Sequence, residues 1–195
     1  MQMMKNIHRS LRRFRRCDYG VAYFEFALSA PVLALLLLGS VEVTRYVLIT
    51  QKVEKTAITI SDLAAQETTA KTSILNNDLI ASQQVMLPYN FNNNGFVIIS
   101  SVTQTGAQTA ANPPIINWQY AGGGTMVETS QIGTVGQKAT LPAGFTLNDK
   151  DNIIVTEVYY KFTPLLNNII LGPTNLYRMA LFRPRLGVLT TLING

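Results

Sequence analysis

The stretch VAYFEFALSAPVLALLLLGSV, residues 21–41, is the most apolar part of this chain and indicates how it begins to fold. Within it, residues 26–41 carry no charge, and twelve of these sixteen residues are Phe, Ala, Val or Leu. A helix of 21 residues, at about 1.5 Å per residue, is long enough to cross the hydrocarbon core of a bilayer. The four consecutive leucines Leu35–Leu38 leave no polar face, which argues against the buried core helix of a soluble protein. We therefore expect a membrane-spanning helix.

The residues in front of this stretch are strongly basic. Residues 1–18 carry six cations and one anion, a charge of +5, whereas residues 19–195 carry ten cations and ten anions. Because no excess of cations remains for a folded basic face, we expect no binding of nucleic acid. Lys and Arg stay on the cytoplasmic side of a membrane, so the N-terminus should be cytoplasmic and the remainder periplasmic, in a bacterium. This topology signal consists of Arg9, Arg12, Arg13, Arg15 and Arg16.

The distribution of chemically reactive residues excludes many enzymes. The only Cys and the only His, Cys17 and His8, both lie in the basic segment. Beyond residue 18 a Ser-His-Asp unit, a Cys-His unit and a Cys/His zinc site are therefore impossible. Residues 148–152 (Asn-Asp-Lys-Asp-Asn) offer oxygen atoms to calcium but lack the EF-hand glycine and distal glutamate, which favours a polar turn. We expect no enzyme, no metal site and no cofactor.

One charged residue, Glu25, interrupts the apolar stretch. A carboxylate at membrane depth is costly and usually functional, although a position near the cytoplasmic interface lowers the cost and would let it be merely tolerated. Gly20 lies five residues before it. A glycine leaves the backbone open to close approach.

The pattern Gly20-Val-Ala-Tyr-Phe-Glu25-Phe26, with a basic leader before it and leucines after it, resembles the cleavage motif of type IVb prepilins. More closely, G-x-x-x-x-E-F-A-L-x-x-P followed by leucines, Gly39, Glu42 and Arg45 resembles the TadE-like family (TadE/TadF type). These are pseudopilins of the tight-adherence (Tad, Flp pilus) secretion system. The resemblance covers residues 9–50, and a weaker one joins VTEVYYKFTPLL, residues 155–166, to Arg183-Pro184-Arg185.

The resemblance implies processing and assembly. A prepilin peptidase would cut between Gly20 and Val21, and Glu25 with Phe26 would set the register of assembly. Glu25 of one subunit would pair with the new amino terminus of its neighbour, so that each buried charge has a partner. The implied partners are the prepilin peptidase, other pseudopilins, the major pilin, the inner-membrane assembly platform and the lipid bilayer.

The residues after the span continue a helical pattern. Residues 43–67 contain no Gly or Pro, and we expect one unbroken helix from about Val21 to Gln66. One side of this helix carries a stripe of residues at helical spacing. Such a stripe more often packs on the chain's own sheet than on another subunit. The stripe consists of Tyr46, Thr50, Val53, Ala57, Ile60 and Ala64. The helix should break within 68–73, and residues 76–80 predict a capped start to a short second helix that ends near Pro88.

The rest of the chain favours β-structure. Strands are expected at 96–104, 115–120 and 153–162, with a further strand at 176–182. In the third strand, the set Ile154, Thr156, Val158, Tyr160 and Phe162 is the better candidate for burial. Short strands could form within 121–124 and 132–144, and a short apolar helix could follow Pro164.

The expected fold class is therefore α+β: a long N-terminal transmembrane and stem helix, then a small antiparallel β-sheet periplasmic domain, as in pilins. The expected segments are a leader at 1–20, a transmembrane helix at 21–42, a helical stem at 43–68 and a periplasmic domain at 69–195. The predicted function is that of a minor pseudopilin, a non-enzymatic assembly subunit held in the bacterial inner membrane by a single span. Whether it also enters a surface pilus is open. The alternatives are an uncleaved, signal-anchored periplasmic ligand-binding protein, a cleaved secretory protein and a tip adhesin.

Overall fold

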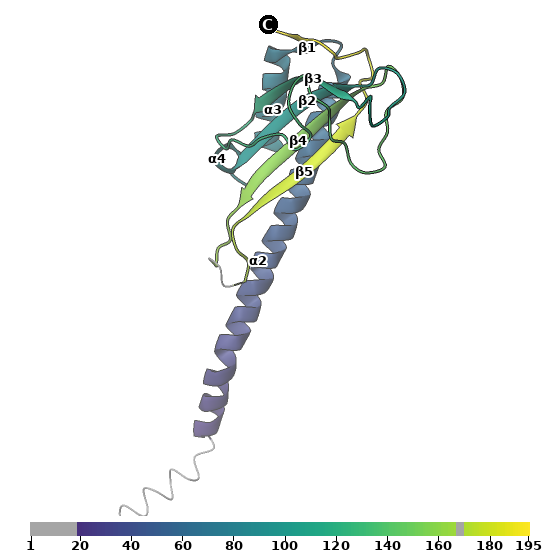
Figure 1. The fold of residues 1–195 in the computed structure, drawn as a ribbon. Helices are drawn as coiled ribbons and strands as arrows, with labels where there is room; N and C mark the ends of the chain where they lie inside the picture. Colours follow the sequence, from purple (N-terminus) through teal and green to yellow (C-terminus); the bar gives the residue numbers. More distant parts are fainter. Residues whose placement is uncertain (1–18, 167–169) are drawn as a thin grey trace, which may run out of the picture. The chain divides into compact units, whose positions relative to one another are not determined.

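The computed structural model describes residues 19–166 and 170–195 (Figure 1). The chain forms two compact units, of which the first ends at Thr44 and the second runs from Arg45 to Gly195. A long apolar helix comes first and a small antiparallel sheet with further helices follows, so the predicted α+β class is confirmed.

Helix α2 (Tyr19–Gln66) is one element of 48 residues with Pro31 inside it. Its end at Gln66 is the one expected from the sequence, and its start lies two residues before the predicted Val21. The chain leaves the helix at Glu67, and a short strand, β1 (Ala70–Lys71), lies within the predicted break.

The second unit is built on a four-stranded antiparallel sheet with the order β3-β2-β4-β5. Its strands are β2 (Gly95–Thr103), β3 (Ile115–Gly122), β4 (Asn152–Phe162) and β5 (Thr174–Phe182). All four strands were expected, each within about two residues of its observed ends. The central pair β2 and β4 is in continuous register from Gly95 opposite Tyr160 to Thr103 opposite Asn152.

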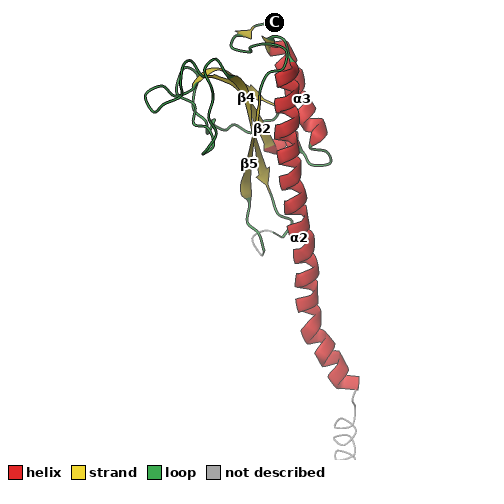
Figure 2. Ribbon diagram, turned by 90° about the vertical axis from the view of Figure 1, so that its right-hand side faces the viewer, coloured by secondary structure: helices red, strands yellow, loops and turns green. Residues whose placement is uncertain are grey.

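One face of this sheet is covered by helices. Figure 2 shows α3 and the C-terminal part of α2 on one side of the sheet and the long loops on the other. The predicted stripe of α2 supplies the contact, since Val53 and Ile60 are 0 % exposed and belong to the same core as Val97, Ile154 and Val158. The ring of Tyr46 also packs edge-on against Phe162, with centroids 5.3 Å apart. The expectation that the stripe packs on the chain's own sheet is confirmed.

The opposite face of the sheet is buried as well. The set led by Ile154 is buried as expected, but Ile153 and Val155 on the other face are also buried, beneath Ile132 and Leu147 of the long connection 123–151. This connection forms no strand and only one isolated bridge, Ile115 with Lys138, so the short strands considered within 132–144 are wrong. The apolar side chains of this loop pack on the second face of the sheet and cover it.

The smaller elements correct two further predictions. Helix α3 (Thr72–Val85) begins before the predicted cap at 76–80, and Lys71 at its N-cap makes no side-chain hydrogen bond. Leu75 is buried against the core, and its packing extends α3 by one turn toward the N-terminus. The predicted helix after Pro164 is wrong for residues 163–166 and 170–173, which are not helical.

The remaining elements close the second unit. The turn at 90–95 is helix α4 (Phe91–Asn94), where the side chain of Asn90 accepts a bond from the backbone N–H of Asn93. Strand β6 (Leu192–Ile193) pairs in parallel with β1, which fastens the C-terminal segment to the start of α3.

Candidate functional site

The predicted processing and register residues lie in the first two turns of α2. Gly20, Val21, Glu25 and Phe26 are all exposed, and a Cβ added at Gly20 would meet nothing within 4 Å. Val21 and Glu25 are four residues apart on the helix, which places them on the same side, one turn from each other. The predicted topology arginines, Arg9 to Arg16, lie outside the described residues.

The apolar surface of this part of α2 is not covered by the residues that the structure describes. The most apolar 18-residue window of the helix is 0 % buried, and large exposed side chains surround it. They include Val21, Tyr23, Phe24, Phe26, Leu28, Val32, Leu33 and Leu35–Leu38. A helix that is hydrophobic all round requires an apolar surrounding, either lipid or other helices. One long apolar helix near the N-terminus is compatible with single-pass anchoring in a membrane.

The serine and threonine hydroxyls of this segment form hydrogen bonds within the helix. Ser29 donates to the Phe26 carbonyl at 3.2 Å, and Ser40 donates to the Leu37 carbonyl at 2.8 Å. Thr44 donates to the Ser40 carbonyl at 2.8 Å. Such bonds to the preceding turn allow small polar residues to sit in a helix that lipid surrounds.

A second polar group, which sequence reasoning missed, lies in the centre of the sheet. Glu157 is 0 % exposed, although it is a carboxylate in the middle of β4. Its Oε1 accepts bonds from the backbone N–H of Gln131 at 2.8 Å and from the hydroxyl of Tyr177 at 3.0 Å. The Ser130 hydroxyl bonds to Oε2, and the Tyr159 hydroxyl lies 3.2 Å from Oε1. A buried charge is tolerated when its acceptor sites are filled in this way.

The surroundings of Glu157 also affect the two tyrosines. Burial, followed by the negative charge of Glu157, raises the pKa of Tyr159 and that of Tyr177 above the ordinary value for a phenol. Both phenols therefore remain protonated. Tyr177 donates its proton to Glu157, whereas the hydroxyl of Tyr159 also lies 2.9 Å from the Thr129 carbonyl, the nearer of its two acceptors. The Glu157 cluster (Glu157, Ser130, Gln131, Tyr159 and Tyr177) fastens the connection 123–151 to the sheet.

A signal for Glu157 was present in the sequence. A single acid within the apolar run IIVTEVYYKF of β4 has the same character as Glu25 in the apolar stretch 21–41. The sequence did not reveal its partners, because Ser130 and Gln131 lie more than 25 residues away in a loop without periodicity.

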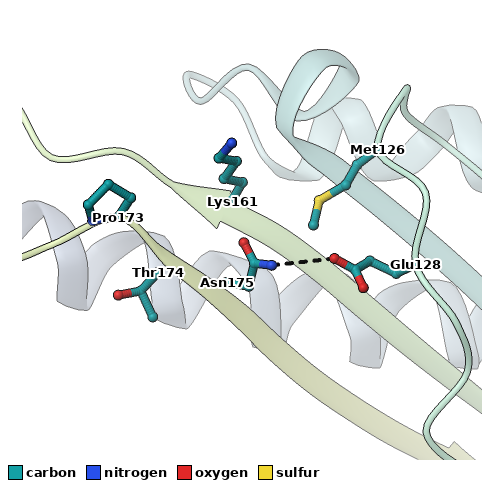
Figure 3. A pocket seen from close by; sticks show the side chains of 6 residues that line it. All are labelled: Met126, Glu128, Lys161, Pro173, Thr174 and Asn175. Carbon is teal, nitrogen blue, oxygen red and sulfur yellow. Dashed lines mark hydrogen bonds between the residues drawn. The ribbon is translucent and has the colours of Figure 1, made fainter.

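Figure 3 shows an open depression of about 690 Å³ between the start of β5 and the loop at 126–128. Met126, Pro173 and Thr174 line it together with Lys161, Glu128 and Asn175. Asn175 donates to Glu128 at 3.4 Å, while Lys161 extends from β4 away from that pair. One carboxylate among six lining residues is too few ligands for a cation site.

The carboxylate oxygens of the polar turn at 148–152 accept hydrogen bonds from other groups of the protein. Asp149 accepts a bond from the backbone N–H of Gly106 at 2.5 Å, and Asp151 accepts from the N–H of Asn148 at 2.7 Å and from Arg183 at 2.8 Å. Lys150 takes a left-handed conformation with φ of 63°. Among the residues that the structure describes, no group of three or more His, Cys, Asp or Glu side chains could hold a metal ion.

Comparisons with known proteins bear on the N-terminal part of the chain. Residues 20–59 match the family model described as TadE-like protein, which confirms the resemblance seen in the motif that starts at Gly20. At the level of the family, a TadE-like domain indicates a pseudopilin associated with a Tad pilus, a structural component that interacts with other pilus components. Searches of the curated proteins and of the solved structures give no match.

Proposed function

We propose, from the TadE-like match at residues 20–59, that this chain is a minor pseudopilin that helps to build a Tad-type (Flp, type IVb-like) pilus or secretion apparatus. The observation that carries the proposal is that the matched segment starts at Gly20 and continues into a helix whose apolar side chains are uncovered. In this proposal residues 1–20 are a cytoplasmic leader, α2 anchors the protein in the bacterial inner membrane, and the sheet domain lies in the periplasm. The chain does no catalysis itself.

Processing between Gly20 and Val21 is the first step of the proposed role. Both residues are exposed at the start of α2, where the peptidase can reach the backbone at the membrane surface. The cut removes the cationic leader and leaves a chain with ten cations and ten anions. The new amino group at Val21 then carries a positive charge at the membrane face.

Assembly is the second step. Glu25 of one subunit binds the amino group of Val21 on a neighbour, which neutralises two charges that lipid disfavours. A displacement by one residue leaves both charges unpaired, so the pair sets register more than it adds stability. The partners in this step are other pseudopilins, the major pilin and the inner-membrane platform.

The N-terminus of the protein purified from its native membrane tests the processing step. Mass spectrometry should find a chain that begins at Val21. Gly20→Leu should retain the leader, because a large side chain blocks approach to the scissile bond, while Ser29→Leu in the same helix should be processed normally. An intact Met1, or a cut after Leu38, would contradict the proposal and favour the signal-anchored or secreted alternatives.

The Glu25→Ala variant tests the assembly step. It should insert and be cleaved like the natural protein, yet fail to support pilus formation in cells that lack the natural copy. Glu54→Ala, which removes an exposed carboxylate from the same helix, is the matched control and should assemble normally. Normal pili with Glu25→Ala would contradict the proposed register role of Glu25, and they would not affect the test of processing.

A further inference from the structure

The second unit contains a pocket that neither the processing site nor the register pair explains. It has a volume of about 370 Å³ and lies between α2 and the segment that follows α3. Leu48, Gln51, Lys52 and Lys55 line it from α2, and Pro88 and Tyr89 line it from the other side.

The polar part of this pocket is cationic. The six lining residues include two lysines and no acid. Lys52 donates one hydrogen bond, 3.1 Å long, to the Val85 carbonyl at the C-terminal end of α3, and its ammonium has two further protons to donate. Lys55 is exposed, and neither lysine forms an ion pair with any residue that the structure describes. Tyr89, which also lines the pocket, carries a hydroxyl as a further donor.

The rest of the pocket and its margin are apolar. Leu48 is 47 % exposed on one wall, and Leu87, next to Pro88, is 57 % exposed. Cations beside exposed apolar side chains complement a molecule that carries an anionic group next to hydrocarbon. A tyrosine at such a place is typical of the boundary between a membrane and water.

The position along the chain points to the same kind of molecule. Leu48 follows Val41, the last residue of the apolar stretch, by only seven residues, and Val43 and Val47 between them are also exposed. At the same end of the second unit, the contact of Tyr46 with Phe162 holds the end of β4. The connection that leaves β4 there exposes Leu165 (66 %) and Ile170 (38 %).

We propose that the Lys52–Lys55 pocket binds the phosphate headgroup of an anionic phospholipid. The two ammonium groups and the Tyr89 hydroxyl receive the phosphate oxygens, and Leu48 with Leu87 contacts the apolar part of the lipid nearest the headgroup. This inference rests on the membrane anchoring in the proposed function but not on cleavage after Gly20. A bound headgroup would hold the start of the second unit against the bilayer surface.

Native mass spectrometry of the full chain, released from lipid nanodiscs, tests this site. Nanodiscs of phosphatidylglycerol are compared with nanodiscs of phosphatidylcholine, which has the same phosphate but no net charge. The natural protein should retain phosphatidylglycerol in preference to phosphatidylcholine. Lys55→Gln should weaken retention by about fivefold, and Lys52→Gln/Lys55→Gln by more than tenfold, on the order expected for loss of one and two cations near a lipid surface.

The control variant is Lys71→Gln/Lys138→Gln, which removes two exposed lysines of the same unit away from the pocket. It should retain lipid as the natural protein does. Because Lys55 makes no hydrogen bond among the described residues, Lys55→Gln tests the site without disturbing α3.

Three outcomes would overturn the lipid site. Equal retention in the natural protein and the pocket variants would do so, as would equal loss in the control. A change in the number of protein copies, with lipid retention unaltered, would assign the pocket to a second copy of the chain. Release of the chain from membranes by alkaline carbonate would instead contradict the anchoring itself, which separates failure of this site from failure of the proposed function.

Discussion

The carboxylate of Glu157 on β4 and the phenol of Tyr177 on β5 meet inside the second unit, with 3.0 Å between Oε1 and the hydroxyl. Tyr159 stands opposite Tyr177 in the register, so Tyr177 is a diagonal neighbour of Glu157 rather than its direct partner. The diagonal lets two tyrosines from adjacent strands approach one carboxylate, while the loop supplies the remaining donors.

The first prediction concerns this carboxylate. Glu157→Gln keeps the shape of the side chain but replaces one acceptor oxygen by a donor, which then faces the Ser130 hydroxyl or the Gln131 N–H. We expect a loss of about 1–3 kcal/mol in the free energy of unfolding. Denaturant unfolding of the full chain in detergent, followed by fluorescence of the single, buried Trp118, measures it.

Glu128→Gln is the matched control for this variant. Glu128 has a hydrogen bond of 3.4 Å to Asn175 at the surface, so its change should stay within about 0.5 kcal/mol. Hydrogen exchange should also rise at residues 128–133 in Glu157→Gln only. Equal effects of the two variants would show that the Glu157 cluster does not hold the loop.

The second prediction concerns alkaline pH. The pKa values of Tyr159 and Tyr177 are raised in the folded protein, so the folded state binds more protons than the unfolded state above about pH 10, the ordinary phenol pKa. Stability is therefore unaffected below that pH and falls as pH rises beyond it. Above this pH, tyrosinate absorbance should increase when the protein unfolds, because Tyr159 and Tyr177 ionise only after unfolding.

Tyr177→Phe removes one of these phenols. Its stability should fall less steeply above about pH 10, even though the loss of a hydrogen bond lowers it by about 1 kcal/mol at neutral pH. Tyr120→Phe serves as control and should keep the slope of the natural protein. A slope that Tyr177→Phe leaves unchanged would contradict the assignment.

The third prediction concerns Asp78 on α3. This side chain is 8 % exposed, its Oδ2 has no hydrogen-bond partner, and burial, together with the charge of Glu67, raises its pKa to about 6. The folded state thus holds the proton more tightly, so stability is highest below about pH 4 and falls as pH rises to about 6. Over this pH range the free energy of unfolding falls by at most about 3 kcal/mol.

Asp78→Asn should remove this dependence and make the protein more stable at neutral pH, since a neutral amide costs less to bury than a carboxylate. Unfolding midpoints on either side of this pH range measure the difference. Asp149→Asn, at an exposed position, should keep the pH dependence of the natural protein. Destabilisation by Asp78→Asn at neutral pH would refute the argument.

The fourth prediction concerns Asn152, which joins the start of β4 to two other segments. Its amide donates to the Ser101 hydroxyl at 2.9 Å and to the Val102 carbonyl at 3.1 Å, and its oxygen accepts from the Leu189 N–H at 2.9 Å. Asn152→Ala removes all three bonds and leaves the buried Leu189 N–H unsatisfied, whereas the Ser101 hydroxyl keeps a bond from Asn117 at 3.3 Å. We expect a loss of about 2–4 kcal/mol and faster hydrogen exchange at residues 187–193.

Asn148→Ala provides the comparison, because that side chain is exposed in the same turn and makes no hydrogen bond of its own. Its effect should lie within about 0.5 kcal/mol. If residues 187–193 exchange at the natural rate in Asn152→Ala, the C-terminal segment is held by other contacts, of which the bond from Trp118 to the Leu189 carbonyl at 2.8 Å is the foremost.

The features predicted well from the sequence are those with a local period. The apolar stretch and the stripe from Tyr46 to Ala64 define α2 without knowledge of any partner, and alternation in 153–162 defines β4. The motif from Gly20 to Phe26 is likewise local, and the family match starts at the same glycine.

The features missed depend on contacts between distant segments. Burial of Ile153 and Val155 requires the loop that contains Ile132 and Leu147, and nothing in the Gly-rich loop itself indicates which face of the sheet it covers. The capping residues at 76–80 predict a start of α3 that is too late, because packing of Leu75 sets the first turn.

The attachment of the 123–151 loop through Ser130 and Gln131 has a practical consequence for following this protein in cells. An epitope or fluorescent label inserted at 130–131 would separate the donors that Glu157 requires. The turn at Pro142–Phe145 offers an insertion point, since Gly144 is exposed, has φ of +83°, and has open space within 4 Å where a side chain would begin. Both chain ends can then keep their natural sequences, and the pairing of β6 with β1 is not disturbed by a C-terminal label.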